Sequence, residues 1–476
     1  MLFNSFQFLL FFPAVTIVFF ALPHRFRWIW LLAASCYFYM ALIPIYILIL
    51  LLTIVVDYFA GILIERSPHP KKRFYLVLSL FTNIGILGFF KYYDFFVENI
   101  NQLLGAMGSG ADIPLLHILL PVGLSFHTFQ AMSYTIEIYR GNQRAERHFG
   151  IYALYVMFYP QLVAGPIERP QNIIHQLKEK KVLRYENVSA GLKQMLWGLF
   201  KKVVIADRLA VIVDQVYNQP GEQSSYSLFV AAILFAFQIY CDFSGYSDIA
   251  LGSARVMGYT LMENFRTPFL SKSVSELWRR WHISLSTWFN DYLYTPFVMN
   301  RRDWGKIAVV GGLLLTFAIS GLWHGAAWTY VIYGMLHGFA IAVEFLTKKT
   351  RKKITGLFPG SFNIIICTLL TFLFFVFTLI FFRATDFAHA ADIIGGIFSF
   401  EGGRGIIGPE VKPGYLFVSA CLLAIFALVD PVMDQLVKDK IRIRHSLGSQ
   451  LTYAFIFVLL ILFGHFSHSS FIYFQF

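Results

Sequence analysis

The chain has 476 residues, of which 57% are hydrophobic, 18% are aromatic and only 14% are charged. A soluble domain carries roughly 25% charged residues, so this composition excludes a water-soluble enzyme. It also excludes a disordered or collagen-like chain, because both have few large apolar residues. The sequence therefore predicts an all-α polytopic membrane protein with about 12 transmembrane helices, at roughly 20 residues per crossing.

The net charge of +12 indicates membrane topology rather than nucleic-acid binding. Excess lysine and arginine in a membrane protein gathers in cytoplasmic loops, so we predict no nucleic-acid partner. The cysteines are isolated within apolar runs and form no CxxC pair, which predicts neither a disulfide framework nor a metal site. They are Cys36, Cys241, Cys367 and Cys421.

Apolar runs predict the first crossings at 3–22, 27–40, 44–62, 74–92 and 115–138. The loops after the first, third and fifth runs are basic, through Arg25, Arg66, Arg140 and their neighbours. Loops separated by an even number of crossings share a side, so these loops are cytoplasmic and the N-terminus is outside. The glycine-rich, acidic stretch after residue 92 is then an external loop.

Residues 151–166 do not fit a simple crossing. They are apolar, but basic segments flank both ends, and the run closes on Pro160, Gly165 and Pro166. A re-entrant helix that enters and leaves from the cytoplasm explains both observations. Broken backbone is tolerated in a membrane only where protein or a water-filled cavity surrounds it, so this segment predicts a cavity.

The second half predicts further crossings at 190–213, 226–243, 307–323, 327–347, 362–383, 414–430 and 450–466. Residues 244–306 contain no clean apolar run and mix arginine with tryptophan, which is typical of re-entrant or interfacial helices. The last span and its tail, 450–476, run outward. We expect residues 1–476 to form a single transmembrane domain in which these helices surround a funnel.

His324 lies between two apolar runs, in the sequence S-G-L-W-H-G-A-A-W. The structural alternative is a core histidine that only bonds a neighbouring helix. Ionisable residues inside membranes are nevertheless functional candidates by default. A buried, neutral imidazole can accept a proton from a hydroxyl nucleophile, so His324 is a candidate general base.

Two further blocks carry polar residues at or near membrane depth. E-L-W-R-R-W-H-I-S-L-S-T-W-F contains His282, Arg279 and Arg280, and alone it fits a snorkelling interfacial helix with tryptophan anchors. Q-I-Y-C-D-F-S-G-Y-S-D-I-A contains Asp242 and Asp248, and alone it fits helix breaking and capping.

Taken together and in this order, the blocks resemble the membrane-bound O-acyltransferase (MBOAT) family, in particular its AlgI-type, alginate-acetylating branch. The resemblance covers nearly the whole chain. Its other segments are V-G-L-S-F-H-T-F-Q, F-Y-P-Q-L-V-A-G-P-I, G-L-F-K-K-V-V-I-A-D-R-L and the final F-I-Y-F-Q-F.

The resemblance implies a multi-pass acetyltransferase of the bacterial inner membrane. It would move acetyl from cytoplasmic acetyl-CoA to an extracellular or periplasmic polysaccharide, with alginate as the first choice. It places the family's invariant histidine on His324 and a second catalytic position on His282. The basic rim candidates for the anionic donor are Arg279 and Arg280.

The expected partners are the acyl donor, membrane lipids and an extracellular SGNH-type acetyltransferase, with no bound cofactor. A carrier-protein thioester stays open as the donor. Teichoic acid D-alanylation and acetylation of peptidoglycan or cellulose stay open as the reaction. A transporter is the other class of function, although no internal repeat supports it.

The final six residues contain four aromatic side chains, at Phe471, Tyr473, Phe474 and Phe476. Exposing this many aromatic side chains to water costs free energy, so the segment should be buried. Because aromatic residues are enriched at membrane interfaces, one interpretation is an interfacial anchor. The alternative, which the resemblance favours, is that the tail inserts toward His324. Tyr473 would then carry the acetyl group as a transient aryl ester.

Overall fold

The computed structural model describes the chain except residues 164, 358, 409, 439–446, 467–470 and 473–476. The described residues are helical apart from loops and one isolated bridge, between Gln223 and Arg404. They form two compact units, one of residues 1–195 with 249–262 and one of residues 196–248 with 263–476. That both units belong to one transmembrane domain stays a prediction.

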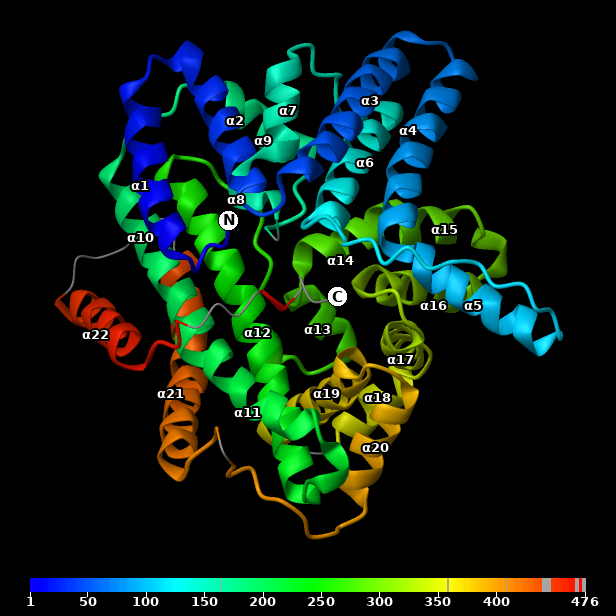
Figure 1. Cartoon of the computed structure of the whole chain (residues 1–476), viewed down its shortest axis with the longest axis vertical. Helices are drawn as coiled ribbons and strands as arrows, with labels where there is room; N and C mark the ends of the chain where they lie inside the picture. The colour runs from blue at the N-terminus through cyan, green and yellow to red at the C-terminus, as the bar shows by residue number, and fades with distance from the viewer. Residues whose placement is uncertain (164, 358, 409, 439–446, 467–470, 473–476) are drawn as a thin grey trace. The chain divides into compact units, whose positions relative to one another are not determined.

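The first unit contains the N-terminal helices, coloured blue to cyan in Figure 1. They are α1 (Phe6–Ala21), α2 (His24–Met40), α3 (Ile47–Arg66), α4 (Lys71–Leu87), α5 (Tyr93–Ala106), α6 (Leu124–Arg140), α7 (Phe149–Met157), α8 (Tyr159–Leu162) and α9 (Pro170–Lys178). Inside this unit, Asp57 of α3 accepts hydrogen bonds from Ser79 and Asn83 of α4. Because a buried carboxylate must be bonded, this cluster fixes how α3 and α4 pack.

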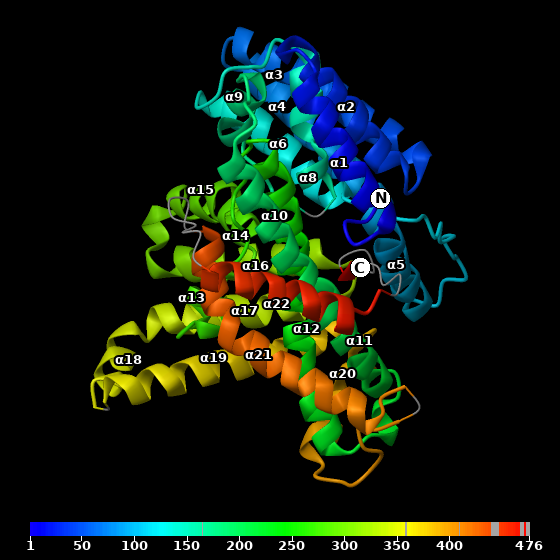
Figure 2. The ribbon, with the colours of Figure 1, turned by 90° about the vertical axis from the view of Figure 1, so that its left-hand side faces the viewer.

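Two helices contribute residues to both units, α10 (Tyr185–Leu199) and α12 (Ser225–Val256). The second unit adds α11 (Asp207–Tyr217), α13 (Val274–Arg280), α14 (Ile283–Phe289), α15 (Thr295–Met299), α16 (Lys306–His324), α17 (Trp328–Leu346), α18 (Lys348–Thr355), α19 (Gly360–Arg383), α20 (Phe387–Phe398), α21 (Pro413–Lys438) and α22 (Leu447–Phe463). Figure 2 faces α21 and α22, coloured orange and red.

Short helical turns join several of these helices. The π-helical turns are η2 (Gly88–Tyr92), η3 (Phe200–Ala206) and η6 (Asn290–Tyr294). The 3₁₀ turns are η1 (Pro44–Tyr46), η4 (Pro220–Glu222), η5 (Pro268–Leu270) and η7 (Arg302–Trp304).

Within the described residues, seven helices are long and apolar enough to cross a membrane. They correspond to seven of the predicted crossings and are Pro44–Arg66, Lys71–Ala106, Ser225–Val256, Lys306–His324, Trp328–Leu346, Gly360–Arg383 and Pro413–Asp434. The protein is thus an all-α, multi-pass membrane protein. The other predicted spans coincide with shorter or less apolar helices: α1, α2, α6, α22 and the α10–α11 stretch.

The predicted external loop after residue 92 is wrong in its first part. The π-turn η2 carries the helix past Tyr92 directly into α5, so that Lys71–Ala106 is one helix of 36 residues. The predicted span 115–138 also starts too early, because the helix begins at Leu124, after Gly123 in the left-handed conformation (φ +77°). Glycine adopts that conformation without strain.

The interfacial or re-entrant segment predicted for 244–306 is wrong for its first thirteen residues, since α12 continues unbroken to Val256. The polar residues that suggested a broken helix have partners in the same unit. Asp248 pairs with Lys201 at 2.5 Å, and Asp242 pairs with Lys202 at 2.5 Å. A helix can therefore hold these carboxylates away from water without ending there. The remainder of the segment does consist of short helices, from η5 to η7.

Close contact between α16 and α17 shapes the hairpin that ends α16 at His324. A Cβ atom on Gly321 would lie 2.2 Å from the carbonyl oxygen of Tyr330, and one on Gly334 would lie 2.0 Å from that of Phe317. Only glycine fits at both positions, and small residues let membrane helices approach this closely.

We predict that Gly334→Ala lowers the thermal midpoint of the purified protein in detergent. The added methyl overlaps a backbone carbonyl, and overpacking of this kind costs roughly 1–3 kcal/mol. Gly85→Ala is the matched control, because Gly85 lies in a helix with open space around its Cβ position. Equal midpoints for the two variants would contradict the close packing of the hairpin.

Candidate active site

His324 is the last residue of α16 and is buried, with 2% of its surface exposed. Its imidazole has aromatic neighbours: Tyr333 of α17, with ring centroids 5.9 Å apart, and Phe382 of α19, at 5.5 Å. The predicted general base is therefore held by three helices of the second unit and is shielded from water.

His282 occupies the junction between α13 and α14 and is fully buried. Its backbone is left-handed, with φ +44° and ψ +53°, a conformation that costs a non-glycine residue about 1–2 kcal/mol. The sharp turn at His282 joins α13 to α14. The conformation of this turn therefore fixes the position of the imidazole.

The two predicted catalytic histidines lie together in the second unit. Their ring centroids are 6.5 Å apart, and Trp323 contacts both rings, at 5.9 Å from His282 and 5.1 Å from His324. Burial lowers the pKa of His282 to about 3, so its imidazole is neutral near pH 7. This arrangement can accept a proton at one ring and orient a polar group at the other.

Two polar contacts hold the chain around His282. Asn264 accepts a hydrogen bond from Ser284 Oγ at 2.6 Å through its side chain and one from Ile283 N at 2.9 Å through its backbone. The carboxylate of Glu344, in α17, accepts hydrogen bonds from Val274 N and Ser275 N at the start of α13. These hydrogen bonds join α14 to the loop at Asn264 and the start of α13 to α17.

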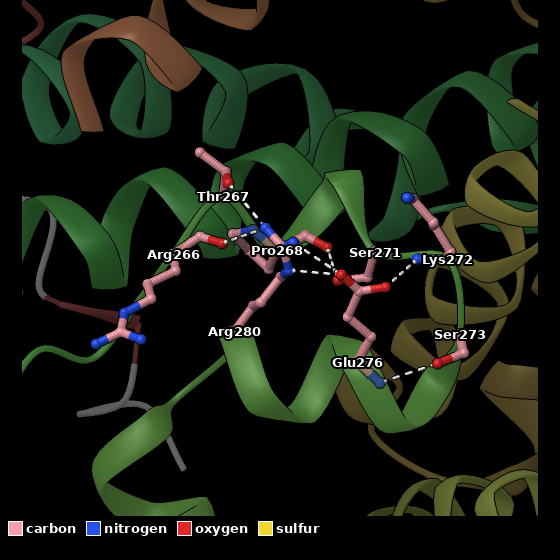
Figure 3. Close-up of polar contacts among 8 residues, drawn as sticks. All are labelled: Arg266, Thr267, Pro268, Ser271, Lys272, Ser273, Glu276 and Arg280. Atoms are coloured by element: carbon pink, nitrogen blue, oxygen red, sulfur yellow. Dashed lines mark hydrogen bonds and ion pairs between the residues drawn. The ribbon is translucent and has the colours of Figure 1, made fainter. Parts of the chain in front are cut away.

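The two arginines predicted as the donor rim differ in their contacts. Arg280 pairs with Glu276 at 2.7 Å, and its guanidinium also reaches Thr267 Oγ1 and the carbonyl of Arg266 (Figure 3). Burial alone would raise the pKa of Glu276, but hydrogen bonds from Lys272 N and Arg280 hold it below its usual range. Arg280 therefore fastens the loop before α13, whereas Arg279 is exposed.

The final segment enters the second unit. Phe471 and Ile472 are buried, with 1% and 5% of their surfaces exposed. Phe471 stacks on Tyr246 of α12 at 4.6 Å, and the backbone N–H of Ile472 donates to Asp242 Oδ2 at 2.7 Å. Because both side chains are buried in the protein, these two residues do not form a lipid anchor. Tyr473, the predicted acyl carrier, lies outside the described residues.

The predicted re-entrant segment 151–166 belongs to the first unit and is a broken helix. Helix α7 ends at Met157, Phe158 interrupts it, and the four-residue α8 follows. Apart from the exposed Phe149, both short helices are buried within that unit. The break agrees with the sequence, while re-entry from the cytoplasm stays a prediction.

Two further buried histidines were not predicted as site residues, His127 of α6 and His337 of α17. His337 lies within hydrogen-bonding distance of Thr378 Oγ1, at 3.1 Å, and its ring is 4.8 Å from that of Tyr333. Like His324 it is a single histidine inside an apolar run, so the same signal could have found it. Its bond to α19 indicates a structural role.

In the described part of the chain, no group of three or more histidine, cysteine, aspartate or glutamate side chains could hold a metal ion.

The described site is thus a pair of buried histidines in a helical, multi-pass membrane protein. The family model described as MBOAT, membrane-bound O-acyltransferase family, matches residues 146–385, which include both histidines. The chain belongs to this family of membrane-bound enzymes.

Curated relatives align over most of the chain. A probable alginate O-acetylase AlgI of Pseudomonas syringae pv. tomato is 37% identical over 404 residues, which is 84% of this chain and 76% of the relative. The peptidoglycan O-acetyltransferase of Helicobacter pylori is 35% identical over 79% of this chain and 74% of its own. The teichoic acid D-alanyltransferase of Bacillus subtilis is 29% identical over 56% of this chain and 70% of its own.

The contrast between the two arginines gives a prediction. Arg280→Ala should lower the stability of the purified protein by about 1 kcal/mol, since it removes a half-exposed ion pair and its loop contacts. Arg279→Ala should leave the thermal midpoint unchanged and raise the KM for acetyl-CoA, if this side chain binds the anionic donor. A normal KM for Arg279→Ala would remove it from the donor site.

Proposed function

We propose that this chain moves an acetyl group from cytoplasmic acetyl-CoA across the bacterial inner membrane, for O-acetylation of an extracellular or periplasmic polysaccharide. Family membership supports the reaction class. The observation that carries the proposal is the buried pair of histidines, His282 and His324, with ring centroids 6.5 Å apart.

The relatives support an envelope polysaccharide as the acceptor. Proteins named for alginate and for peptidoglycan O-acetylation are almost equally similar to this chain, at 37% and 35% identity. The D-alanyltransferase relative aligns with only 56% of the chain, which favours the acetylating branch. We retain alginate as the first candidate acceptor and peptidoglycan as the second.

In the proposed reaction, His324 acts as general base toward an incoming hydroxyl. The hydroxyl oxygen attacks the thioester carbonyl, a C–O bond forms and the C–S bond breaks. The proton taken by His324 passes to the departing thiolate, which leaves as the free thiol of CoA. His282 is proposed to orient the thioester or to stabilise the oxyanion, for which a neutral imidazole N–H is a suitable donor.

The proposed topology has about 12 crossings, with both ends outside and the basic loops inside. Helix α18, with Lys348, Lys349, Arg351, Lys352 and Lys353, is the most basic of these loops. The cytoplasmic donor would enter a funnel on this side, while the polymer stays outside. An integral protein is required because the two substrates are separated by the membrane.

The final segment supports a relay through Tyr473. Its neighbours Phe471 and Ile472 are buried in the same unit as the histidine pair. In the relay, the phenol oxygen accepts the acetyl group from the donor. An extracellular SGNH-type partner then receives the group, and the phenol is regenerated. A phenol with a pKa near ~10 is a workable nucleophile with base help and a good leaving group afterwards.

We predict that His324→Ala inserts and folds but loses polymer acetylation by roughly 100-fold or more, the typical contribution of a general base. The acetyl content of the polymer and acetyl-CoA turnover by detergent-purified protein are the measurements. His282→Ala should also show a large defect.

His337→Gln is the matched control for the histidine variants. It changes another fully buried histidine while keeping a hydrogen-bonding group near Thr378, and we expect activity close to that of the parent protein. Wild-type acetylation in His324→Ala would disprove the general-base mechanism.

Tyr473→Phe tests the relay, because it removes only the hydroxyl and keeps the aromatic ring. We expect polymer acetylation to be lost, with a normal amount of protein in the membrane. The acetylated protein itself should be detectable by mass spectrometry of the C-terminal peptide and absent in the variant. An unchanged acetyl content would reduce Tyr473 to a packing residue.

A further inference from the structure

The segment that follows α22 is bound to the second unit at two separate places. At the first, Arg208 donates to the carbonyl of Phe463 at 2.9 Å, and His465 N donates to the carbonyl of Val203 at 2.8 Å. At the second, Ile472 N donates to Asp242 Oδ2 at 2.7 Å. The chain is therefore fixed on both sides of the residues between these two places.

The second attachment point is a buried carboxylate that shares a lysine with another carboxylate. Lys202 Nζ lies 2.5 Å from Asp242 Oδ1 and 2.8 Å from Asp207 Oδ1, and all three side chains are almost completely buried. A buried carboxylate needs hydrogen-bond donors as well as a counter-charge, and the N–H of Ile472 donates to Asp242.

Backbone packing brings this ion pair together. A Cβ atom on Gly245 of α12 would lie 2.7 Å from the carbonyl oxygen of Gly198 and 3.0 Å from Lys202 N. The glycine lets α12 approach the start of η3 closely, so Asp242 lies within reach of Lys202. The acceptor for Ile472 is thus set by the fold of the unit.

A chain of aromatic contacts leads from this attachment point to the histidine pair. Phe471 contacts Phe243, with ring centroids 5.6 Å apart, and Phe243 contacts His282 at 4.7 Å. Tyr473, the proposed acyl carrier, is the next residue in the sequence after Ile472. Loss of the bond between Ile472 and Asp242 should therefore affect the relay.

We propose that Asp242, held by Lys202, is a positioning residue for the acyl relay, because it docks Phe471 and Ile472 in the unit that contains the histidine pair. The proposal rests on the relay function of Tyr473. Asp242 takes no part in bond making or breaking. Its contribution is an acceptor oxygen, fixed by an ion pair, for one backbone N–H of the segment.

Labelling of an introduced thiol tests the docking directly. In full-length protein whose native cysteines are replaced by serine, Ile472→Cys should react slowly with a maleimide, since position 472 is buried. Adding Asp242→Ala should speed labelling roughly 10-fold or more, the effect of losing one hydrogen bond to a charged group. Adding Asp242→Asn should keep labelling slow, because the amide oxygen still accepts from the backbone and Lys202 retains Asp207.

Asp248→Asn is the matched control, since it breaks the neighbouring ion pair, with Lys201, on the same helix. It should leave labelling slow. Three results would overturn the proposal: slow labelling in Asp242→Ala, equally fast labelling in Asp242→Asn, or fast labelling in Asp248→Asn. The last would show that any broken ion pair loosens the unit.

Activity provides the second measurement, in protein with its native residue at position 472. Asp242→Ala should lower kcat for polymer acetylation roughly 10-fold with an unchanged KM for acetyl-CoA, and Asp242→Asn should recover most of it. If Tyr473→Phe stays active while Asp242→Ala accelerates labelling, the relay is wrong and the docking contact stands. If labelling is unaffected while Tyr473→Phe is inactive, the docking contact is wrong and the relay stands.

Discussion

Buried charge is the constraint on which the second unit depends. A lone ammonium or carboxylate away from water costs several kcal/mol, and this unit buries Lys201, Lys202, Asp207 and Asp242. Each of them is paired across elements, joining η3 and the start of α11 to α12. The pairs can form only at one register of these helices. The apolar packing that surrounds them, including the histidine site, must therefore follow that register.

The site combines this polar framework with an aromatic shell. Rings of Trp323, Tyr333 and Phe382 surround His324, and Phe243 and Trp323 contact His282. Such a shell keeps water away from both imidazoles. The left-handed turn at His282 and the glycine contacts of α16 and α17 leave little freedom for either ring to move. The family's chemistry is thus supported by backbone geometry as much as by the histidines themselves.

Hydropathy was sufficient to predict the long apolar helices, such as Gly360–Arg383, since a run of that length has no other stable fold. It failed where polar residues lie inside a helix. Asp242 and Asp248 suggest a helix end when read locally, and only their pairing with distant lysines explains why α12 continues. It also failed at η2, because a π-turn that joins two helices has no distinctive composition.

The same contrast holds for the site. His324 could be selected from its sequence context, because a single ionisable residue among apolar ones is rare, whereas His282 lies beside two arginines and was selected only through the family resemblance. Their proximity could not be predicted, since it depends on the turn at His282 and the packing of α13 against α17. The role of Arg280 was also hidden, because its partner Glu276 lies on the same short helix and an exposed arginine has the same sequence pattern.

The π-turn η3 has a consequence for how this segment can change in length. Each residue of an α-helix rotates the following side chains by about 100°, and a π-turn contains one residue more per turn than an α-helix would hold. Removing one residue from 200–206 would restore a regular α-helix, in which the side chains of this stretch, including Lys201 and Lys202, point in different directions relative to the helices on either side. Lysines and aspartates that now meet would then face different neighbours. The other side chains of this stretch can vary in type. The number of residues in it is fixed, because Lys201 and Lys202 must reach their aspartate partners.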